Sequence, residues 1–203
     1  MPRTWRRFLL GNWFVANLAV FASGSGTNFQ ALAEALRATS HRTACLITDK
    51  KNAFALQRAE TLGIPSHYVS YAGRGREEAE EEIISLLESY KIAYIALAGF
   101  MRLLTPRLID AYPSRIINIH PALLPKYPGA HGIADSYASG DRELGITIHY
   151  VDYGLDSGPV ILQKSFIRGG AESLAEIEAR IHELEHLWYP RVITALLDAA
   201  GNS

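Results

Sequence analysis

The chain has 203 residues, a formal net charge of −1 and 48% hydrophobic residues. One domain of this length can bury about 70% of the surface of the unfolded chain, so a compact soluble fold is expected. The near-neutral charge argues against a nucleic-acid partner, and no segment has the roughly 20 apolar residues of a membrane helix. Cys45 is the single cysteine, so an internal disulfide is excluded, and we expect it in a buried strand and a reducing cytoplasm.

Residues 1–16 precede the first predicted strand and carry three arginines before Phe8-Leu9-Leu10. Basic residues before an apolar stretch resemble a secretory signal, and residues 19–22 could serve as its cleavage site. Cleavage there would remove the strand that should support the glycine-containing loop after it. We therefore expect an N-terminal extension over 1–16 and a single domain over 17–203, with export as the alternative.

Apolar strands and amphipathic helices alternate through the first 120 residues. The predicted strands are 18–22, 43–48, 66–69, 92–98 and 115–119. The predicted helices are 28–38, 53–62, 77–90 and a short helix beginning near Thr105-Pro106. The continuous apolar run at 92–98 is typical of a central parallel strand buried on both faces. This alternation predicts a Rossmann-like, doubly wound α/β sheet that is mostly parallel, with right-handed crossovers.

The pattern changes in the last third of the chain. Residues 145–152 and 160–167 alternate in polarity and are predicted strands, at least one of them antiparallel to the rest. His149 lies within the first of them and is expected to be structural. A long helix is predicted from Ser173. Because Pro190 lacks a backbone N–H, we expect it to kink or interrupt this helix, leaving 192–199 as a second helical piece.

The most distinctive segment is Asn118-Ile119-His120-Pro121, at the end of a predicted strand. Residues two apart on an extended chain point to the same face, so the amide and the imidazole should lie together. Asp156, in a glycine-framed turn, is the candidate carboxylate partner of His120. Asn118 and protonated His120 could stabilise an oxyanion, while Asp156 orients His120 and favours its charged form. By itself an Asn-x-His pair at a strand end is more often a structural hydrogen-bonded pair.

A glycine-containing loop, residues 23–28, joins the first predicted strand to the first predicted helix. Its glycines let backbone N–H groups approach an anion, and the helix N-terminus adds favourable partial charge. The loop matches neither the G-x-G-x-x-G fingerprint nor a Walker loop. A phosphate site is therefore one interpretation, and an empty connection is the other.

Five motifs resemble those of the folate-dependent formyltransferases and follow the family's order. They are SGSGTNFQAL at 23–32, LAGFMRLL at 97–104, NIHPALLP at 118–125, GLDSGPVIL at 154–162 and ARIHELEHLWYP at 179–190. The resemblance covers most of the chain. It implies direct transfer of a formyl group from 10-formyltetrahydrofolate to the primary amine of N1-(5-phospho-β-D-ribosyl)glycinamide, in the synthesis of the purine nucleotide IMP.

The resemblance also implies roles for particular residues. Asn118, His120 and Asp156 match the family's catalytic set. The substrate is expected to bind its phosphate at Gly26, Thr27 and Asn28 and its glycinamide end near Glu185. The formyl donor is expected to contact Asn118, Asp156, Arg76, Met101, Arg102, Leu103, Leu104 and Asp152. Without the resemblance, the residues at 101–104 could be core packing and Arg76 a surface charge.

Several alternatives are weighed against this function. His182 and His186 lie one helical turn apart, but no H-E-x-x-H motif is present and the family needs no metal, so we expect none. A formyl-folate hydrolase and an initiator-tRNA formyltransferase would each need an added domain. A non-catalytic nucleotide-binding module on the same fold is the alternative from another class. We expect small-molecule substrates only, neither nucleic acid nor membrane as partner, and a cytoplasmic monomer or homodimer.

Overall fold

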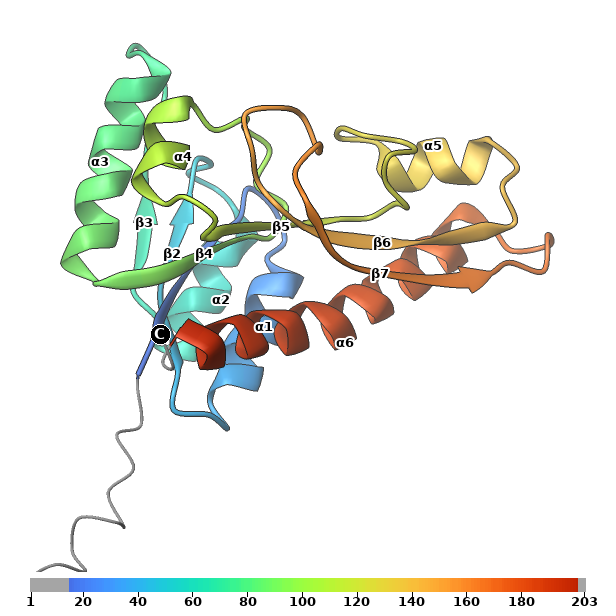
Figure 1. Cartoon of the computed structure of the whole chain (residues 1–203), viewed down its shortest axis with the longest axis horizontal. Coiled ribbons are helices and arrows are strands. Elements are labelled where there is room, and N and C mark those ends of the chain that lie inside the picture. Colours follow the sequence, from blue (N-terminus) through green and yellow to red (C-terminus); the bar gives the residue numbers. More distant parts are fainter. Residues whose placement is uncertain (1–14, 201–203) are drawn as a thin grey trace, which may run out of the picture.

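The computed structural model describes residues 15–200, which form a seven-stranded sheet with helices on both faces (Figure 1). The strands are β1 (Asn17–Phe21), β2 (Arg42–Thr48), β3 (Ser66–Tyr68), β4 (Ile92–Leu97), β5 (Ile116–His120), β6 (Glu143–Tyr150) and β7 (Val160–Ile167). The helices are α1 (Thr27–Leu36), α2 (Phe54–Leu62), α3 (Arg76–Ser89), α4 (Pro106–Ala111), α5 (Gly132–Ala138) and α6 (Leu174–Ala200). Residues 1–14 of the predicted extension lie outside the described residues, so the extension stays a prediction.

The strand order is β3-β2-β1-β4-β5-β6-β7. The first five strands in this order are parallel, whereas β6 runs antiparallel to both β5 and β7. The predicted α/β sheet and its antiparallel portion are therefore confirmed. The chain winds outward from β1 to β3 and then returns to the other side of β1 with β4. Open α/β sheets bind ligands at such a reversal, beyond the carboxyl ends of the strands.

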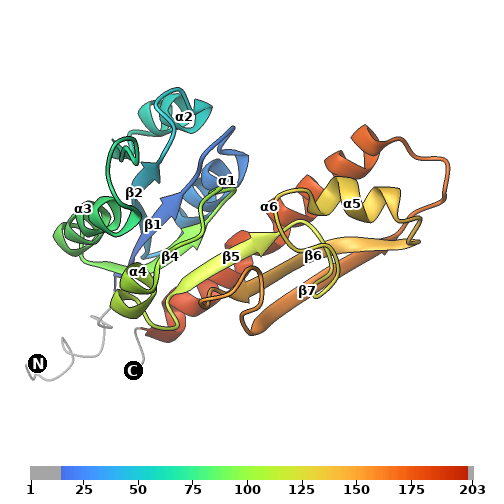
Figure 2. The same ribbon diagram turned by 90° about the horizontal axis from the view of Figure 1, so that it is seen from above.

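Two hydrophobic clusters cover the two faces of the sheet. On one face, side chains of α1, α2 and α6 pack against β1, β4 and β6, and on the other α3 and α4 cover the parallel strands. Figure 2 shows α6 running along the antiparallel end of the sheet, beside β6 and β7. Cys45 is buried in β2 as predicted, and burial raises the pKa of its thiol to about 12.

Two helical predictions differ from the structure. α6 continues through Pro190 as one helix, so the predicted second piece at 192–199 is wrong. A proline inside a helix costs about 3 kcal/mol, but buried side chains on both sides of it, Tyr189 and Ile193 among them, keep the helix on the sheet. α5 was not predicted, because it has only seven residues and begins with glycine. No helix within residues 15–200 combines the length and apolar character needed to cross a membrane.

Candidate active site

The end of β5 and the loop between β6 and β7 bring the three predicted catalytic side chains together. Asn118 Nδ2 lies 3.3 Å from Asp156 Oδ1, and His120 Nδ1 lies 3.4 Å from Asp156 Oδ2. Asp156 has a φ of 52°, a left-handed conformation that non-glycine residues seldom adopt. Residues held in such conformations are concentrated at functional sites. The two-residue spacing at the strand end predicted that Asn118 and His120 lie together, and the glycine-framed turn predicted Asp156 as the partner of His120.

Both ring nitrogens of His120 face hydrogen-bond acceptors. Nε2 donates to the backbone carbonyl oxygen of Tyr127 at 2.7 Å, and Nδ1 faces Asp156. Only the imidazolium form could donate at both positions. Burial nevertheless lowers the pKa of His120, against the opposing effects of the Asp156 charge and the Tyr127 carbonyl, and the net pKa is below its ordinary value. The expected charged form is thus not favoured overall, because desolvation outweighs the carboxylate.

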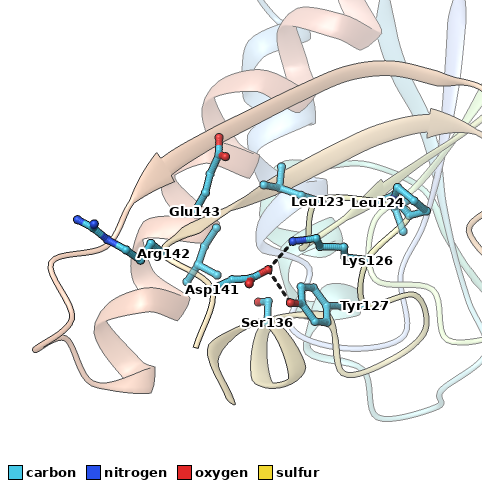
Figure 3. A pocket seen from close by; sticks show the side chains of 10 residues that line it. Leu123, Leu124, Lys126, Tyr127, Ser136, Asp141, Arg142 and Glu143 are labelled. Carbon is cyan, nitrogen blue, oxygen red and sulfur yellow. Dashed lines mark hydrogen bonds and ion pairs between the residues drawn. The ribbon is translucent and has the colours of Figure 1, made fainter. Parts of the chain in front are cut away.

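The loop after β5 holds the Tyr127 carbonyl in place. Tyr127 has a φ of 57°, and its hydroxyl donates to Asp141 at 2.7 Å. Lys126 donates to the same carboxylate oxygen at 2.8 Å, and Figure 3 shows both side chains converging on Asp141. A cavity of about 390 Å³ lies beside this loop, but Asn118, His120 and Asp156 do not line it. We therefore do not assign the chemistry to this cavity.

Asp156 is held as a carboxylate by several neighbours. Gly129 N–H donates to its Oδ2 at 2.7 Å, and His149 Nε2 lies 3.6 Å from its Oδ1. Burial acts to raise the pKa of Asp156, but the hydrogen bonds and the two nearby imidazoles outweigh it, so the net pKa lies below the ordinary value. Asp156 is therefore ionised at neutral pH and available to accept hydrogen bonds.

His149 is a member of this cluster that the sequence interpretation treated only as structural. Its Nδ1 donates to the backbone carbonyl oxygen of Tyr150 at 2.8 Å, and its Nε2 lies 3.2 Å from Asn118 Nδ2. The missing signal was the strand register, which pairs Asn118 with His149 across β5 and β6.

Replacing Asn118 with leucine keeps the approximate volume but removes the amide donor. We expect kcat for acyl transfer to fall by about a hundredfold, as is typical when one oxyanion donor is lost. The affinity for the substrates should change less, because the donor acts mainly on the transition state. Steady-state kinetics and equilibrium binding would separate the two effects. A folded variant that keeps the wild-type kcat would remove Asn118 from the chemistry.

The predicted phosphate loop and the C-terminal helix meet at a second polar cluster. Asn28 Nδ2 donates to Glu185 Oε2 at 2.9 Å, and His182 Nδ1 lies 2.9 Å from the same oxygen. The hydrogen bond to Glu185 raises the pKa of His182. Asn28 Oδ1 is buried and has no hydrogen-bond partner among residues 15–200, so it can accept a hydrogen bond from a ligand. The charge of Glu185 also opposes, in small part, the burial that lowers the pKa of His120.

Gly26 shows why the loop before α1 needs a glycine. Its φ is 74°, and a Cβ at this position would lie 2.7 Å from the Cβ of Ala55. The close approach of α2 and the left-handed turn together exclude a larger residue. The N–H groups at the start of α1, beginning with Thr27, follow directly and have no earlier turn of helix to bond to. This geometry suits an anion.

The residues predicted to contact the formyl donor in the loop after β4 are either exposed or partly buried. Met101 and Leu103 are 65% and 54% exposed, although they are apolar, in the loop after β4. Leu104 packs partly against the core, and the Arg102 side chain forms an ion pair with Asp49 at 2.7 Å. Exposed apolar side chains at the carboxyl end of a central strand are suited to contact a ligand ring.

Arg76 and Asp152 are also predicted to contact the formyl donor, but their surroundings differ from those of residues 101–104. Arg76 is the first residue of α3, and its exposed side chain makes no hydrogen bond or ion pair within the described chain. No such contact links the Arg76 side chain to the other predicted site residues within residues 15–200. Asp152 Oδ1 accepts hydrogen bonds from Gly154 N–H at 3.0 Å and Ser157 Oγ at 2.7 Å, so its carboxylate shapes the loop that carries Asp156.

Residues 15–200 contain no group of three or more histidine, cysteine, aspartate or glutamate side chains arranged to hold a metal ion. The imidazoles of His182 and His186 instead stack, with ring centroids 6.3 Å apart. His182 is engaged by Glu185, as described above.

Comparison with known proteins agrees with this arrangement. The family model described as "Formyl transferase" matches residues 16–193. The chain belongs to the formyl transferase family. Proteins named phosphoribosylglycinamide formyltransferase are similar to it. The one from Bacillus subtilis is 43% identical and the one from Escherichia coli 38% identical. The matches cover 88% and 90% of this chain and 93% and 87% of those proteins.

A solved structure of another formyl transferase has the same fold. It is glycinamide ribonucleotide transformylase 1 from Geobacillus kaustophilus, which is 43% identical and superimposes with a TM-score of 0.87. The match covers 91% of this chain and 100% of that chain. The doubly wound sheet with its antiparallel end and long final helix is therefore the formyl transferase fold.

The loop that carries Asp156 in this formyl transferase depends on Gly158. A Cβ at Gly158 would lie 1.9 Å from the backbone oxygen of Tyr150. We expect Gly158→Ala to lower the free energy of unfolding by about 1–3 kcal/mol, because the backbone must shift to relieve the overlap. Thermal and urea denaturation would measure the change. Gly75→Ala is the matched control, since nothing lies within 4 Å of a Cβ there, and a similar loss in both variants would contradict the prediction.

Proposed function

We propose that this chain transfers a formyl group from 10-formyltetrahydrofolate to the primary amine of N1-(5-phospho-β-D-ribosyl)glycinamide, a step of purine nucleotide synthesis. The observation that carries the proposal is the cluster of Asn118, His120 and Asp156 on a chain of this family. An amide donor, an imidazole and an ionised carboxylate are the groups that an acyl transfer to an amine requires. The names of its relatives, including a purine biosynthetic protein of Drosophila melanogaster, support the substrate assignment.

The chemistry follows from these groups. The substrate amine attacks the formyl carbon, a C–N bond forms, and negative charge develops on the formyl oxygen of a tetrahedral intermediate. Asn118 and His120 stabilise that oxygen by hydrogen bonding. A ring nitrogen of His120 must exchange its present partner, Tyr127 or Asp156, for the oxyanion, and catalytic hydrogen bonds commonly form fully only in the complex. The bond from carbon to N10 of the folate then breaks.

Proton transfer completes the balance of the reaction. The attacking amine loses one proton, and N10 of the departing tetrahydrofolate gains one. We propose that Asp156 accepts the amine proton, directly or through a water molecule, because it is ionised at neutral pH. The developing oxyanion favours the imidazolium form of His120, which opposes the desolvation that lowers its pKa. No serine or cysteine nucleophile is needed, and the transfer is direct.

The substrate subsites follow from the two loops and α6. We propose that the phosphate binds at Gly26, Thr27 and Asn28, and that the glycinamide end lies near Glu185. The open acceptor Asn28 Oδ1 supports this position, because substrate N–H or O–H groups can donate to it. The folate is proposed to lie against residues 101–104 and the loop carrying Asp152, with Arg76 as the least supported contact.

A formyl-transfer assay with the purified full chain tests the proposal. We expect loss of 10-formyltetrahydrofolate and formation of tetrahydrofolate to require glycinamide ribonucleotide. The alternative, a nucleotide-binding module without catalysis, would bind the ribonucleotide but release no tetrahydrofolate. Release of formate without the ribonucleotide would indicate a hydrolase instead. We propose that the chain acts in the cytoplasm as a monomer or a homodimer, and gel filtration of the purified chain would distinguish these two states.

A further inference from the structure

A buried carboxylate lies where the strand order reverses. Asp49 follows β2, and its side chain is 1% exposed. Its Oδ1 accepts a hydrogen bond from Ser23 Oγ at 2.6 Å, and its Oδ2 accepts one from Arg102 Nε at 2.7 Å. Ser23 begins the loop after β1, and Arg102 belongs to the loop after β4. One side chain therefore joins the two loops that are proposed to hold the two substrates.

Main-chain groups take part in the same junction. Met101 N–H donates to Ser23 Oγ at 3.0 Å, and Ser23 N–H donates to the carbonyl oxygen of Gly99, also at 3.0 Å. The Ser23 hydroxyl thus accepts from one loop and donates to Asp49. Because a hydroxyl has one proton, the carboxylate of Asp49 decides which way that proton points.

The Arg102 side chain is held from two sides. Besides its bond to Asp49, its guanidinium lies over the Tyr71 ring, 4.1 Å from the ring centroid. Burying a carboxylate costs free energy that an ion pair only partly offsets, so such a pair is weak evidence for a role in stability. A partly buried ion pair that fixes two ligand loops against each other is better explained by the geometry it imposes.

We infer that Asp49 is a positioning residue that holds the donor loop, residues 99–104, against the substrate loop, residues 23–28, during formyl transfer. The inference rests on the proposed function. Asp49 acts through Ser23, Met101 and Arg102 rather than by touching a substrate. Loss of its charge should therefore weaken donor binding first, because Arg102 loses its ion pair while the catalytic cluster at β5 is untouched.

The principal test is Asp49→Asn in the full chain. Asparagine keeps the size of the side chain and can still accept the Ser23 hydrogen bond, but it cannot pair with Arg102. We expect KM for 10-formyltetrahydrofolate to rise about tenfold, as for loss of one charge-assisted hydrogen bond. KM for glycinamide ribonucleotide should rise less, and kcat should stay within about threefold of wild type. Calorimetry should show a parallel loss of affinity for tetrahydrofolate.

Two further variants make the test specific. Arg102→Met breaks the same ion pair from the other side, so the double variant should be little worse than either single variant. Lys50→Met is the matched control, because its ammonium lies 4.0 Å from the same carboxylate but is exposed, and we expect it to leave both KM values unchanged.

Three results would overturn the inference. They are KM values within about twofold of wild type in folded Asp49→Asn and Arg102→Met, strictly additive effects in the double variant, or a lower Tm with unchanged KM values. Absence of transfer by the wild-type chain would instead refute the proposed function. Tetrahydrofolate binding to the same variants would still decide the role of Asp49 in that case.

Discussion

Replacing His120 with alanine is expected to lower kcat for formyl transfer by about a hundredfold to a thousandfold, the range typical of losing one oxyanion-stabilising group. The His120 side chain is 4% exposed and lies between the Tyr127 carbonyl oxygen and the Asp156 carboxylate, both of which are acceptors and cannot replace the lost donor. Substrate affinity should change much less than kcat, because the interaction strengthens as charge develops. Steady-state kinetics and calorimetric substrate binding measure the two quantities separately.

The control for this experiment removes an imidazole elsewhere. His67 belongs to β3 at the opposite edge of the sheet and pairs with the hydroxyl of Tyr90. We expect His67→Ala to keep kcat near the wild-type value, although it loses a hydrogen bond. Thermal denaturation of both variants would show whether each is folded at the assay temperature. A folded His120→Ala variant that matches the His67→Ala variant in kcat would rule out the catalytic assignment.

Asp156→Asn is expected to have the second large effect, a fall in kcat of about a hundredfold. Asparagine keeps the shape of the side chain but removes the charge that raises the pKa of His120 against burial. The pKa of His120 should therefore move further below its ordinary value, and less imidazolium forms near neutral pH. Lowering the pH should partly restore the activity of the variant relative to wild type, because imidazolium returns as the pH falls through the new pKa.

Nuclear magnetic resonance titration of His120, together with pH-rate profiles, provides the measurement. Asp135→Asn is the matched control, since it removes an exposed carboxylate from α5 without touching the cluster. We expect the control to leave both the His120 titration and kcat unchanged. An unshifted His120 titration in Asp156→Asn would exclude the electrostatic coupling, and an unchanged kcat would exclude Asp156 from the reaction.

Most of the sheet was predictable because its strands carry strong local signals. The apolar run at 92–98 is buried as β4, and the alternating segment at 160–167 is the outermost strand β7. Local sequence patterns did not predict the helices correctly where tertiary packing determines the structure. Pro190 stays within α6 because both flanking turns are buried, and α5 is too short to show a helical period.

Part of the candidate site was predictable because it also depends on local sequence signals. The spacing of Asn118 and His120 is a local property of a strand, and it predicted their common face. The approach of His149 depends on the register between β5 and β6, which no short segment encodes. The Tyr127 carbonyl reaches His120 through a loop with a left-handed residue, and a tyrosine in the sequence gives no indication of that conformation. Asp49 was missed because it and its two side-chain partners, Ser23 and Arg102, come from three separate loops.

The pairing of Asn28 with Glu185 has a consequence for the order in which the molecule forms. The two residues are 157 positions apart, and α6 is further held by Tyr189, whose hydroxyl reaches the carbonyl oxygens of Leu97 and Ile117. Contacts between such distant positions form late, because closing a long loop costs entropy. Synthesis begins at the N-terminus, so β1 to β5 leave the ribosome before Glu185 does. We therefore expect a nascent chain to complete its sheet first and to acquire its substrate site only when the final helix docks.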